Sequence, residues 1–158
     1  MVNMNILNPW WEGKEFIKDD RTLREYEEKT YRWEPVLLKT LDLAPNSIYT
    51  LRGPRQVGKT TLIKLLIKKL LLNVNEKAIF FWNCDELVDF RELAVILREY
   101  LEFSKAHNIK EKYIFLDEIA RVKDWQRAIK ALKDSGELDS CSLLVTGSHT
   151  LDIKYGVE

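Results

Sequence analysis

Cysteine, histidine and long apolar runs are scarce in this chain of 158 residues. Its two cysteines, Cys84 and Cys141, have no metal-ligand spacing, so we expect buried, reduced thiols and no zinc site or disulfide framework. The apolar run at residues 65–72 contains two lysines and is too short to cross a bilayer. The first residues lack the charged and then apolar pattern of a signal peptide. These features predict a cytoplasmic location and no membrane contact.

An excess of charge of one sign is also missing. Lysine plus arginine and aspartate plus glutamate each number 25, so the formal net charge is zero. No overall field attracts nucleic acid or an anionic membrane, and nucleic acid binding is not indicated. Hydrophobic residues make up 46% and charged residues 32% of the chain, which at this length predicts one domain with a sizeable core.

The most specific pattern in the sequence is the stretch 53–60, which reads GPRQVGKT and matches G-x-x-x-x-G-K-[ST] at every position. An apolar segment at 48–51 before it predicts a strand, and residues 61–72 after it predict a helix. Glycines in such a loop let backbone N–H groups point inward, at the positive end of the helix that follows. The loop therefore predicts a phosphate site formed by Gly53, Pro54, Arg55, Gln56, Val57, Gly58, Lys59, Thr60 and Thr61.

Two of these residues have expected roles of their own. Lys59 supplies a positive charge for the β- and γ-phosphates, and the Thr60 hydroxyl is placed to bind Mg²⁺. The alternative, a glycine turn with an incidental lysine, explains neither the strand before the loop nor the helix after it.

Strand and helix patterns alternate along the rest of the chain. Strands are expected at 48–52, 78–82, 113–116 and 142–145, and helices at 59–72, at 87–106 and from Trp125 to near Gly136. The alternation predicts an α/β, three-layer P-loop NTPase fold, in which helices cover both faces of a parallel sheet. The functional side chains of such a sheet lie at the carboxyl ends of its strands.

The third strand ends in two acids, Asp117 and Glu118. An acid at this edge holds Mg²⁺, a role for Asp117, and a second acid orients the attacking water, a role for Glu118. A polar strand end that caps the next helix is the alternative explanation. The complete phosphate loop upstream favours the metal and water roles.

Residues 1–45 are expected to form an N-terminal extension, and residues 46–158 the core. A helical pattern covers 19–34, in which Leu23, Tyr26, Tyr31 and Trp33 are expected to lie against the core, and a second helix is expected at 36–43. Trp10, Trp11 and Trp33 are predicted to pack the extension onto the core. An alternative places Tyr31 or Trp33 beside a bound nucleobase.

Three motifs together resemble the AAA-type P-loop ATPases: residues 53–60, residues 115–118 (FLDE) and residues 144–148 (LVTGS). The sequences WQRAI at 125–129 and NPWWEG at 8–13 resemble an archaeal and bacterial group of AAA ATPases. The resemblance implies ATP rather than GTP as substrate. It also implies that Thr146, or alternatively Ser148, senses the γ-phosphate, and that Asn83 restrains the catalytic acid Glu118.

Related ATPases continue beyond the fourth strand with a fifth strand, a lid and often an arginine finger. Ten residues follow Ser148 here, and no arginine follows Arg127. We therefore expect Mg²⁺-dependent ATP binding with slow hydrolysis, or alternatively a regulatory module that binds ATP without hydrolysing it. The phosphate-loop strand should lie at an open sheet edge, covered by the N-terminal extension, by self-association or by a partner protein.

Overall fold

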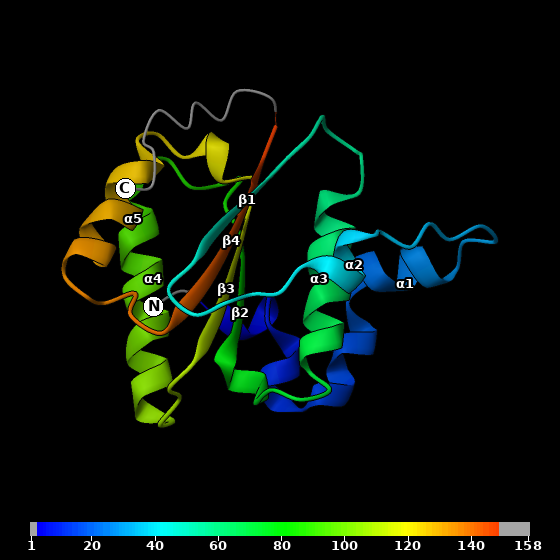
Figure 1. Ribbon diagram of the computed structural model, residues 1–158, viewed down its shortest axis with the longest axis horizontal. Helices are drawn as coiled ribbons and strands as arrows, with labels where there is room; N and C mark the ends of the chain where they lie inside the picture. Colours follow the sequence, from blue (N-terminus) through cyan, green and yellow to red (C-terminus); the bar gives the residue numbers. More distant parts are fainter. Residues whose placement is uncertain (1–2, 149–158) are drawn as a thin grey trace.

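The computed structural model describes residues 3–148, which form a four-stranded parallel sheet between two layers of helices (Figure 1). The strands lie in the order β1-β4-β3-β2. Their bounds are β1 Ile48–Arg52, β2 Ile79–Asn83, β3 Lys112–Asp117 and β4 Cys141–Gly147. Because all neighbours are parallel, the carboxyl ends of the four strands meet at one edge. The predicted α/β, three-layer fold is confirmed.

Helices cover both faces of this sheet. One face carries α3 (Lys59–Leu70), with α1 (Arg21–Glu27) and α2 (Leu37–Thr40) beside it, and the other carries α4 (Phe90–Ala106) and α5 (Trp125–Asp134) (Figure 1). Short 3₁₀ helices complete the described part: η1 Met4–Ile6, η2 Pro9–Glu12, η3 Lys14–Asp19, η4 Glu76–Ala78 and η5 Ile119–Arg121. The core helices and strands agree with the predicted ones to within a few residues.

Three of the four strands, β2, β3 and β4, are largely buried. Every residue of β4 and the first four residues of β2 are buried, as expected of a sheet covered on both sides. On α4, the side chains of Leu93, Leu97 and Tyr100 are 0% exposed, at the spacing of one helical face. This packing fixes the positions of the strand ends where the site lies.

The N-terminal segment packs against the outer edge of β2. The buried Asn8 amide donates from Nδ2 to Phe81 O at 3.1 Å and accepts from Phe81 N at 2.7 Å, so it pairs with β2 as a neighbouring strand would. Trp10 and Trp11 both donate from Nε1 to Ile79 O, at 3.1 and 2.8 Å. The extension therefore covers the β2 edge, at the opposite side of the sheet from β1.

The helix predicted over residues 19–34 forms only in part: Leu23 is buried as expected, but the second half of the segment is neither helical nor packed on the core. Helix α1 ends at Glu27, and residues 28–36, here called the arm, project from the body between α1 and α2 (Figure 1). Tyr31 and Trp33 are 90% and 63% exposed, so Trp33 does not pack the extension onto the core. The arm is charged and contains Pro35, and it has no continuous apolar face to hold a longer helix on α3. The second helix is likewise shorter than expected, because α2 spans only Leu37–Thr40.

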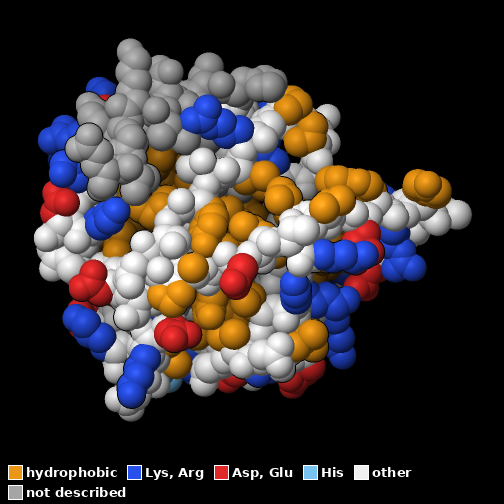
Figure 2. All heavy atoms as spheres, in the orientation of Figure 1, with side chains coloured by type: hydrophobic (Ala, Val, Ile, Leu, Met, Phe, Trp, Pro, Cys, Tyr) orange, Lys and Arg blue, Asp and Glu red, His pale blue; other side chains and the backbone are white. Residues whose placement is uncertain are grey.

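Strand β1 forms the other edge of the sheet and is the least buried strand. Thr50 and Arg52 are exposed, and the remaining β1 residues are half-buried. Figure 2 shows hydrophobic side chains gathered on this side of the molecule, between the two helical layers, and further ones along the arm. Within residues 3–148, no helix combines the length and hydrophobicity needed to span a membrane.

Candidate functional site

The loop between β1 and α3 has the backbone shape that the glycine pattern predicted. Gln56 and Gly58 adopt left-handed conformations, with φ of 62° and 90°. At Gly53 an added Cβ would lie 3.1 Å from Val57 Cγ2, so the loop closes tightly there. Gly58 is the N-cap of α3 and no side chain caps the helix, which leaves N–H groups of its first turn for an anion.

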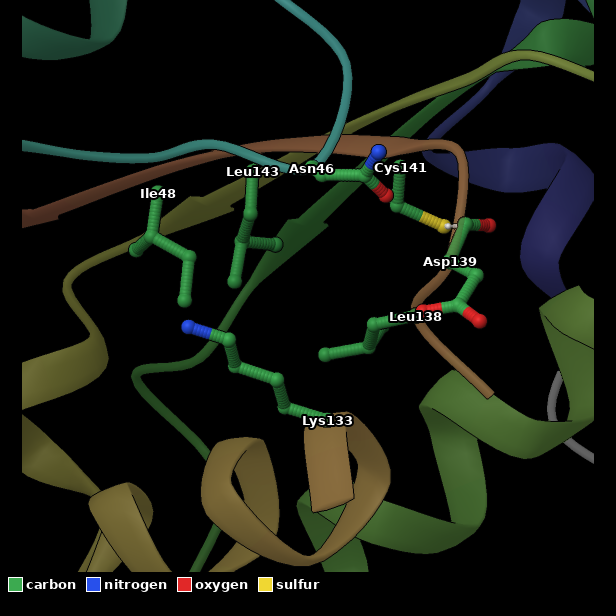
Figure 3. Close-up of a pocket in the computed structure, with 7 residues that line it drawn as sticks. All are labelled: Asn46, Ile48, Lys133, Leu138, Asp139, Cys141 and Leu143. Carbon is green, nitrogen blue, oxygen red and sulfur yellow. Dashed lines mark hydrogen bonds between the residues drawn. The ribbon is translucent and has the colours of Figure 1, made fainter. Parts of the chain in front are cut away.

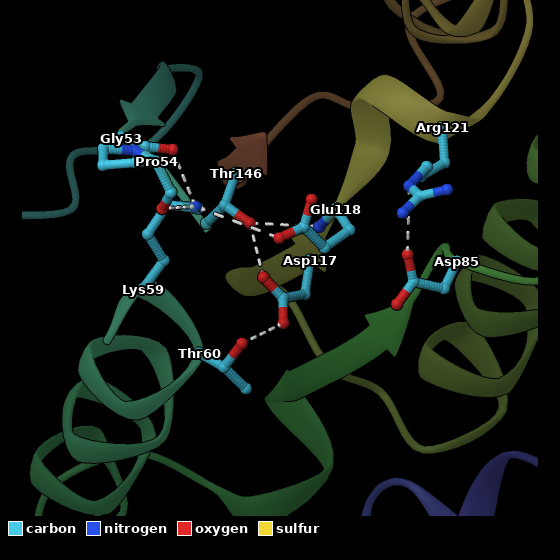
Figure 4. A network of polar contacts seen from close by, with 9 residues as sticks. All are labelled: Gly53, Pro54, Lys59, Thr60, Asp85, Asp117, Glu118, Arg121 and Thr146. Atoms are coloured by element: carbon cyan, nitrogen blue, oxygen red, sulfur yellow. Dashed lines mark hydrogen bonds and ion pairs between the residues drawn. The ribbon is translucent and has the colours of Figure 1, made fainter. Parts of the chain in front are cut away.

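Lys59 occupies the interior of this loop. Its side chain is 5% exposed, and Nζ lies 3.9 Å from Glu118 Oε1. Nζ also donates to Gly53 O and Pro54 O, both at 2.8 Å (Figure 4). The ammonium is therefore held between the loop and the tip of β3. The loop side chains from Pro54 to Val57 are exposed.

Asp117 lies at the carboxyl end of β3 and is 2% exposed. Thr60 Oγ1 donates to its Oδ2 at 2.5 Å, which joins the first turn of α3 to the tip of β3. A carboxylate and a hydroxyl are hard oxygen donors, and Mg²⁺ is commonly bound by one or two such groups together with water. The pair fits this metal. No group of three or more His, Cys, Asp or Glu side chains that could hold a metal occurs in the described part of the chain.

Thr146, at the end of β4, joins the two acids. Its hydroxyl donates to Asp117 Oδ1 at 2.5 Å and accepts from the backbone N–H of Glu118 at 3.0 Å (Figure 4). Thr146 is 0% exposed. Since a hydroxyl has one proton, this arrangement commits it to Asp117.

Glu118 has a left-handed backbone, with φ of 53° and ψ of 38°. This conformation is uncommon outside glycine and costs on the order of 1–3 kcal/mol at a strained site. Two hydrogen bonds maintain it, from Glu118 N to Thr146 Oγ1 and from Arg121 N to Glu118 O at 3.1 Å. The Glu118 side chain, 20% exposed, turns toward Lys59.

The resemblance suggested two further residues, Asn83 and Ser148. Asn83 is exposed, and its side-chain oxygen accepts from Asp85 N at 2.9 Å, an Asx turn rather than a contact with Glu118. Ser148 is half-buried and is the last residue described. Arg121 pairs with Asp85 at 3.6 Å, on the side of η5 away from Lys59 (Figure 4). The end of the predicted core, residues 149–158, lies outside the described residues.

One residue near the site was missed in the sequence. Lys64 lies one helical turn after Thr60 and is 4% exposed. Its Nζ bonds to Asp20 at 2.8 Å. Its spacing could have indicated a position near the site, because a lysine four residues after Thr60 lies on the same face of the helix.

A separate small cavity lies at the opposite end of the sheet (Figure 3). It has a volume of about 100 Å³ and lies beside the first residues of β1 and β4, with Ile48, Leu138 and Leu143 among its lining residues. Because the phosphate loop and both acids lie at the carboxyl ends of the strands, this cavity is not part of the site.

The parallel sheet, the phosphate loop and the acids opposite it define a P-loop nucleotide-binding domain of the ATPase type. A family profile described as an AAA domain matches residues 45–158, most of the chain. The chain therefore belongs to the AAA domain family, and the resemblance predicted from its motifs is confirmed.

Two proteins of Methanocaldococcus jannaschii are similar to the chain. The uncharacterised protein MJ1637 is 26% identical over 163 residues, which cover 98% of this chain and 33% of that protein. The uncharacterised protein MJ1544 is 26% identical over 114 residues, covering 68% of this chain and 22% of that protein. The chain thus spans about a third or less of the length of these relatives.

Among solved structures, that of PCH-2 from C. elegans is similar to this chain, and the alignment covers 98% of this chain and 40% of the PCH-2 chain. The sequence identity is 18% and the TM-score is 0.48.

Proposed function

We propose that this domain binds ATP with Mg²⁺ and hydrolyses it slowly. The observation that carries the proposal is the single cluster formed by the phosphate loop and the tips of β3 and β4. In it, Lys59 Nζ lies 3.9 Å from Glu118 and Thr60 bonds to Asp117. A cationic, amide-lined loop facing two carboxylates is suited to a triphosphate and its metal.

The proposed roles follow from these positions. Residues 53–61 bind the phosphates, with Lys59 on the β- and γ-phosphates, and Thr60 and Asp117 hold Mg²⁺, which neutralises charge on the phosphates when it is bound. Glu118 orients the attacking water as general base, because its carboxylate is the partly exposed one of the pair. Thr146 fixes both acids, and the choice of ATP over GTP rests on the family resemblance.

A slow rate is supported by the contacts that Lys59 and Arg121 make. Lys59 is bonded to two loop carbonyls, and these bonds must break or rearrange before it reaches a phosphate. Arg121 is paired with Asp85. An arginine that reaches the transferred phosphate is worth about 10³–10⁵ in rate, so we expect the domain to need such a group from outside its described residues.

Glu118→Gln tests the proposal directly. We expect it to abolish phosphate release while Mg²⁺-dependent ATP binding, measured by calorimetry, stays within about twofold of wild type. The alternative, a nucleotide-dependent regulatory module without hydrolysis, predicts no phosphate release above background from wild type, and thus no effect of the substitution. GTP in place of ATP serves as the matched ligand control, and failure to bind ATP would refute the proposal.

We further propose that the exposed edge of β1 is a surface for self-association or for a partner protein. The N-terminal segment occupies the β2 edge, so it does not serve this one. Thr50 is exposed on β1, and a charge on an edge strand opposes pairing. Light scattering with and without Mg²⁺ and ATP should report self-association that Thr50→Lys reduces; unchanged mass in both proteins would favour a partner protein.

A further inference from the structure

One face of α3 links the candidate metal site to the N-terminal segment. Thr60, Lys64 and Lys68 are spaced four residues apart, so they lie in one row along the helix. Thr60 bonds to Asp117, Lys64 pairs with Asp20 at 2.8 Å, and Lys68 pairs with Glu27 at 2.7 Å. Asp20 is the N-cap of α1 and Glu27 is its last residue. The same row of side chains therefore bonds to Asp117 at one end and holds α1 against α3 along the rest of its length.

The two ion pairs along this row differ in burial. Lys64 and Asp20 have side chains 5% and 10% exposed, whereas Lys68 and Glu27 are 50% and 44% exposed. The Lys64 ammonium also lies 3.7 Å from the centre of the Phe81 ring and 5.3 Å from that of Trp10. A charge in such surroundings is weakly screened and acts over a longer range than one at the surface.

Lys64 lies between the candidate site and the N-terminal segment, one helical turn after Thr60, which bonds to Asp117. Burial lowers the pKa of the Lys64 ammonium, while the charges of Asp20 and, more weakly, Asp117 oppose that shift. Asp20 supplies the balancing charge that is in direct contact with Lys64.

We propose that the buried Asp20–Lys64 pair is a positioning pair that couples the N-terminal segment to Mg²⁺ binding with nucleotide. This inference rests on the proposed function. With Asp20 in place the ammonium is neutralised, and Asp117 keeps its full attraction for a divalent cation. Without Asp20, every Lys64 side chain that keeps its proton carries an uncompensated charge, which repels Mg²⁺ and attracts Asp117. Docking of α1 and loading of the metal thus favour one another.

The experiment measures Mg²⁺ and ADP binding in four proteins: wild type, Asp20→Asn, Lys64→Met and the double variant. Asparagine retains an N-cap side chain for α1, and methionine retains packing against the Phe81 ring. Calorimetry follows ADP binding with Mg²⁺ and with EDTA, and circular dichroism verifies that each variant is folded. Glu27→Gln, which removes the exposed ion pair of the same helix, is the matched control.

We expect Asp20→Asn to weaken the apparent Mg²⁺ affinity on the order of tenfold and to leave ADP binding in EDTA unweakened. Lys64→Met should not weaken Mg²⁺ binding, and the double variant and Glu27→Gln should lie within about twofold of wild type. If both single variants weaken Mg²⁺ binding alike and the double variant does not recover it, the pair is only structural and the inference fails. If Asp20→Asn does not fold, the inference requires that Lys64→Met and the double variant bind Mg²⁺ no more weakly than wild type. If wild type binds no ADP with Mg²⁺, the proposed function itself fails.

Discussion

The Thr146 hydroxyl donates to Asp117 Oδ1 at 2.5 Å and at the same time accepts from the backbone of Glu118. One buried side chain of β4 thereby fixes the carboxylate of Asp117 and the left-handed backbone of Glu118. Sequence resemblance suggested Thr146 as a sensor of the γ-phosphate. With its proton given to Asp117, Thr146 is better placed to hold the two acids in register.

Thr146→Val tests that arrangement. It keeps the shape of the side chain but leaves Asp117 Oδ1 and Glu118 N without their partner, so we expect a loss of about 2 kcal/mol in unfolding free energy. Turnover should fall more than ATP affinity, because the position of Glu118 changes. Urea unfolding and phosphate release measure the two effects. Thr146→Ser, which restores the hydroxyl, is the control, and equal losses in both variants would contradict the role.

Lys59→Met should weaken nucleotide binding by about tenfold to a hundredfold, since it removes a charged hydrogen-bond donor from the phosphates. The buried position of Lys59 inside the loop is the reason for the expectation. Lys69→Met is the matched control on the same helix, because the Lys69 side chain is exposed and bonded to Leu38 O. Calorimetry with ATP should show wild-type affinity for the control. Equal binding by Lys59→Met and wild type would place the phosphates elsewhere.

Asn8→Ala should destabilise the protein by about 2–4 kcal/mol, because it leaves buried backbone groups of Phe81 and Met4 unpaired. Trp33→Ala, in the exposed arm, should change the free energy of unfolding by less than about 0.5 kcal/mol. Both values come from urea unfolding followed by circular dichroism. A larger loss for Trp33→Ala than for Asn8→Ala would show that the arm, and not the β2 edge, anchors the segment.

The two cysteines should resist thiol reagents in the folded protein. Burial raises the pKa of Cys141 to about 11 and that of Cys84 further still. At pH 8 both thiols are thus protonated and inaccessible. Labelling should be slow until urea unfolds the chain and then reach two thiols. Because the folded pKa values are raised, the stabilisation that burial of the neutral thiols provides is complete below the unfolded thiol pKa, and it is lost as pH rises toward 11. Rapid labelling of the native protein at pH 8 would contradict this burial.

Much of the fold could be read along the chain because each part of it depends on local pattern. The phosphate loop, the four strands and the α3, α4 and α5 helices each follow from glycine placement or from apolar periodicity over a few residues. The second half of the 19–34 prediction failed for the same reason. Local pattern favoured a helix there, but no complementary apolar surface holds residues beyond Glu27 on α3.

The sequence by itself determined the phosphate loop and the order of strands and helices, since short-range spacing specifies both. Tertiary structure alone decided that Asn8 pairs with the β2 edge, that Thr146 bridges two acids and that Lys64 finds Asp20. Each of these contacts joins positions far apart in the chain. Their polar groups find hydrogen-bond partners only after the strands have paired in the order β1-β4-β3-β2. Spacing in the sequence could not predict these three contacts, because they form only when the folded chain buries the polar groups together.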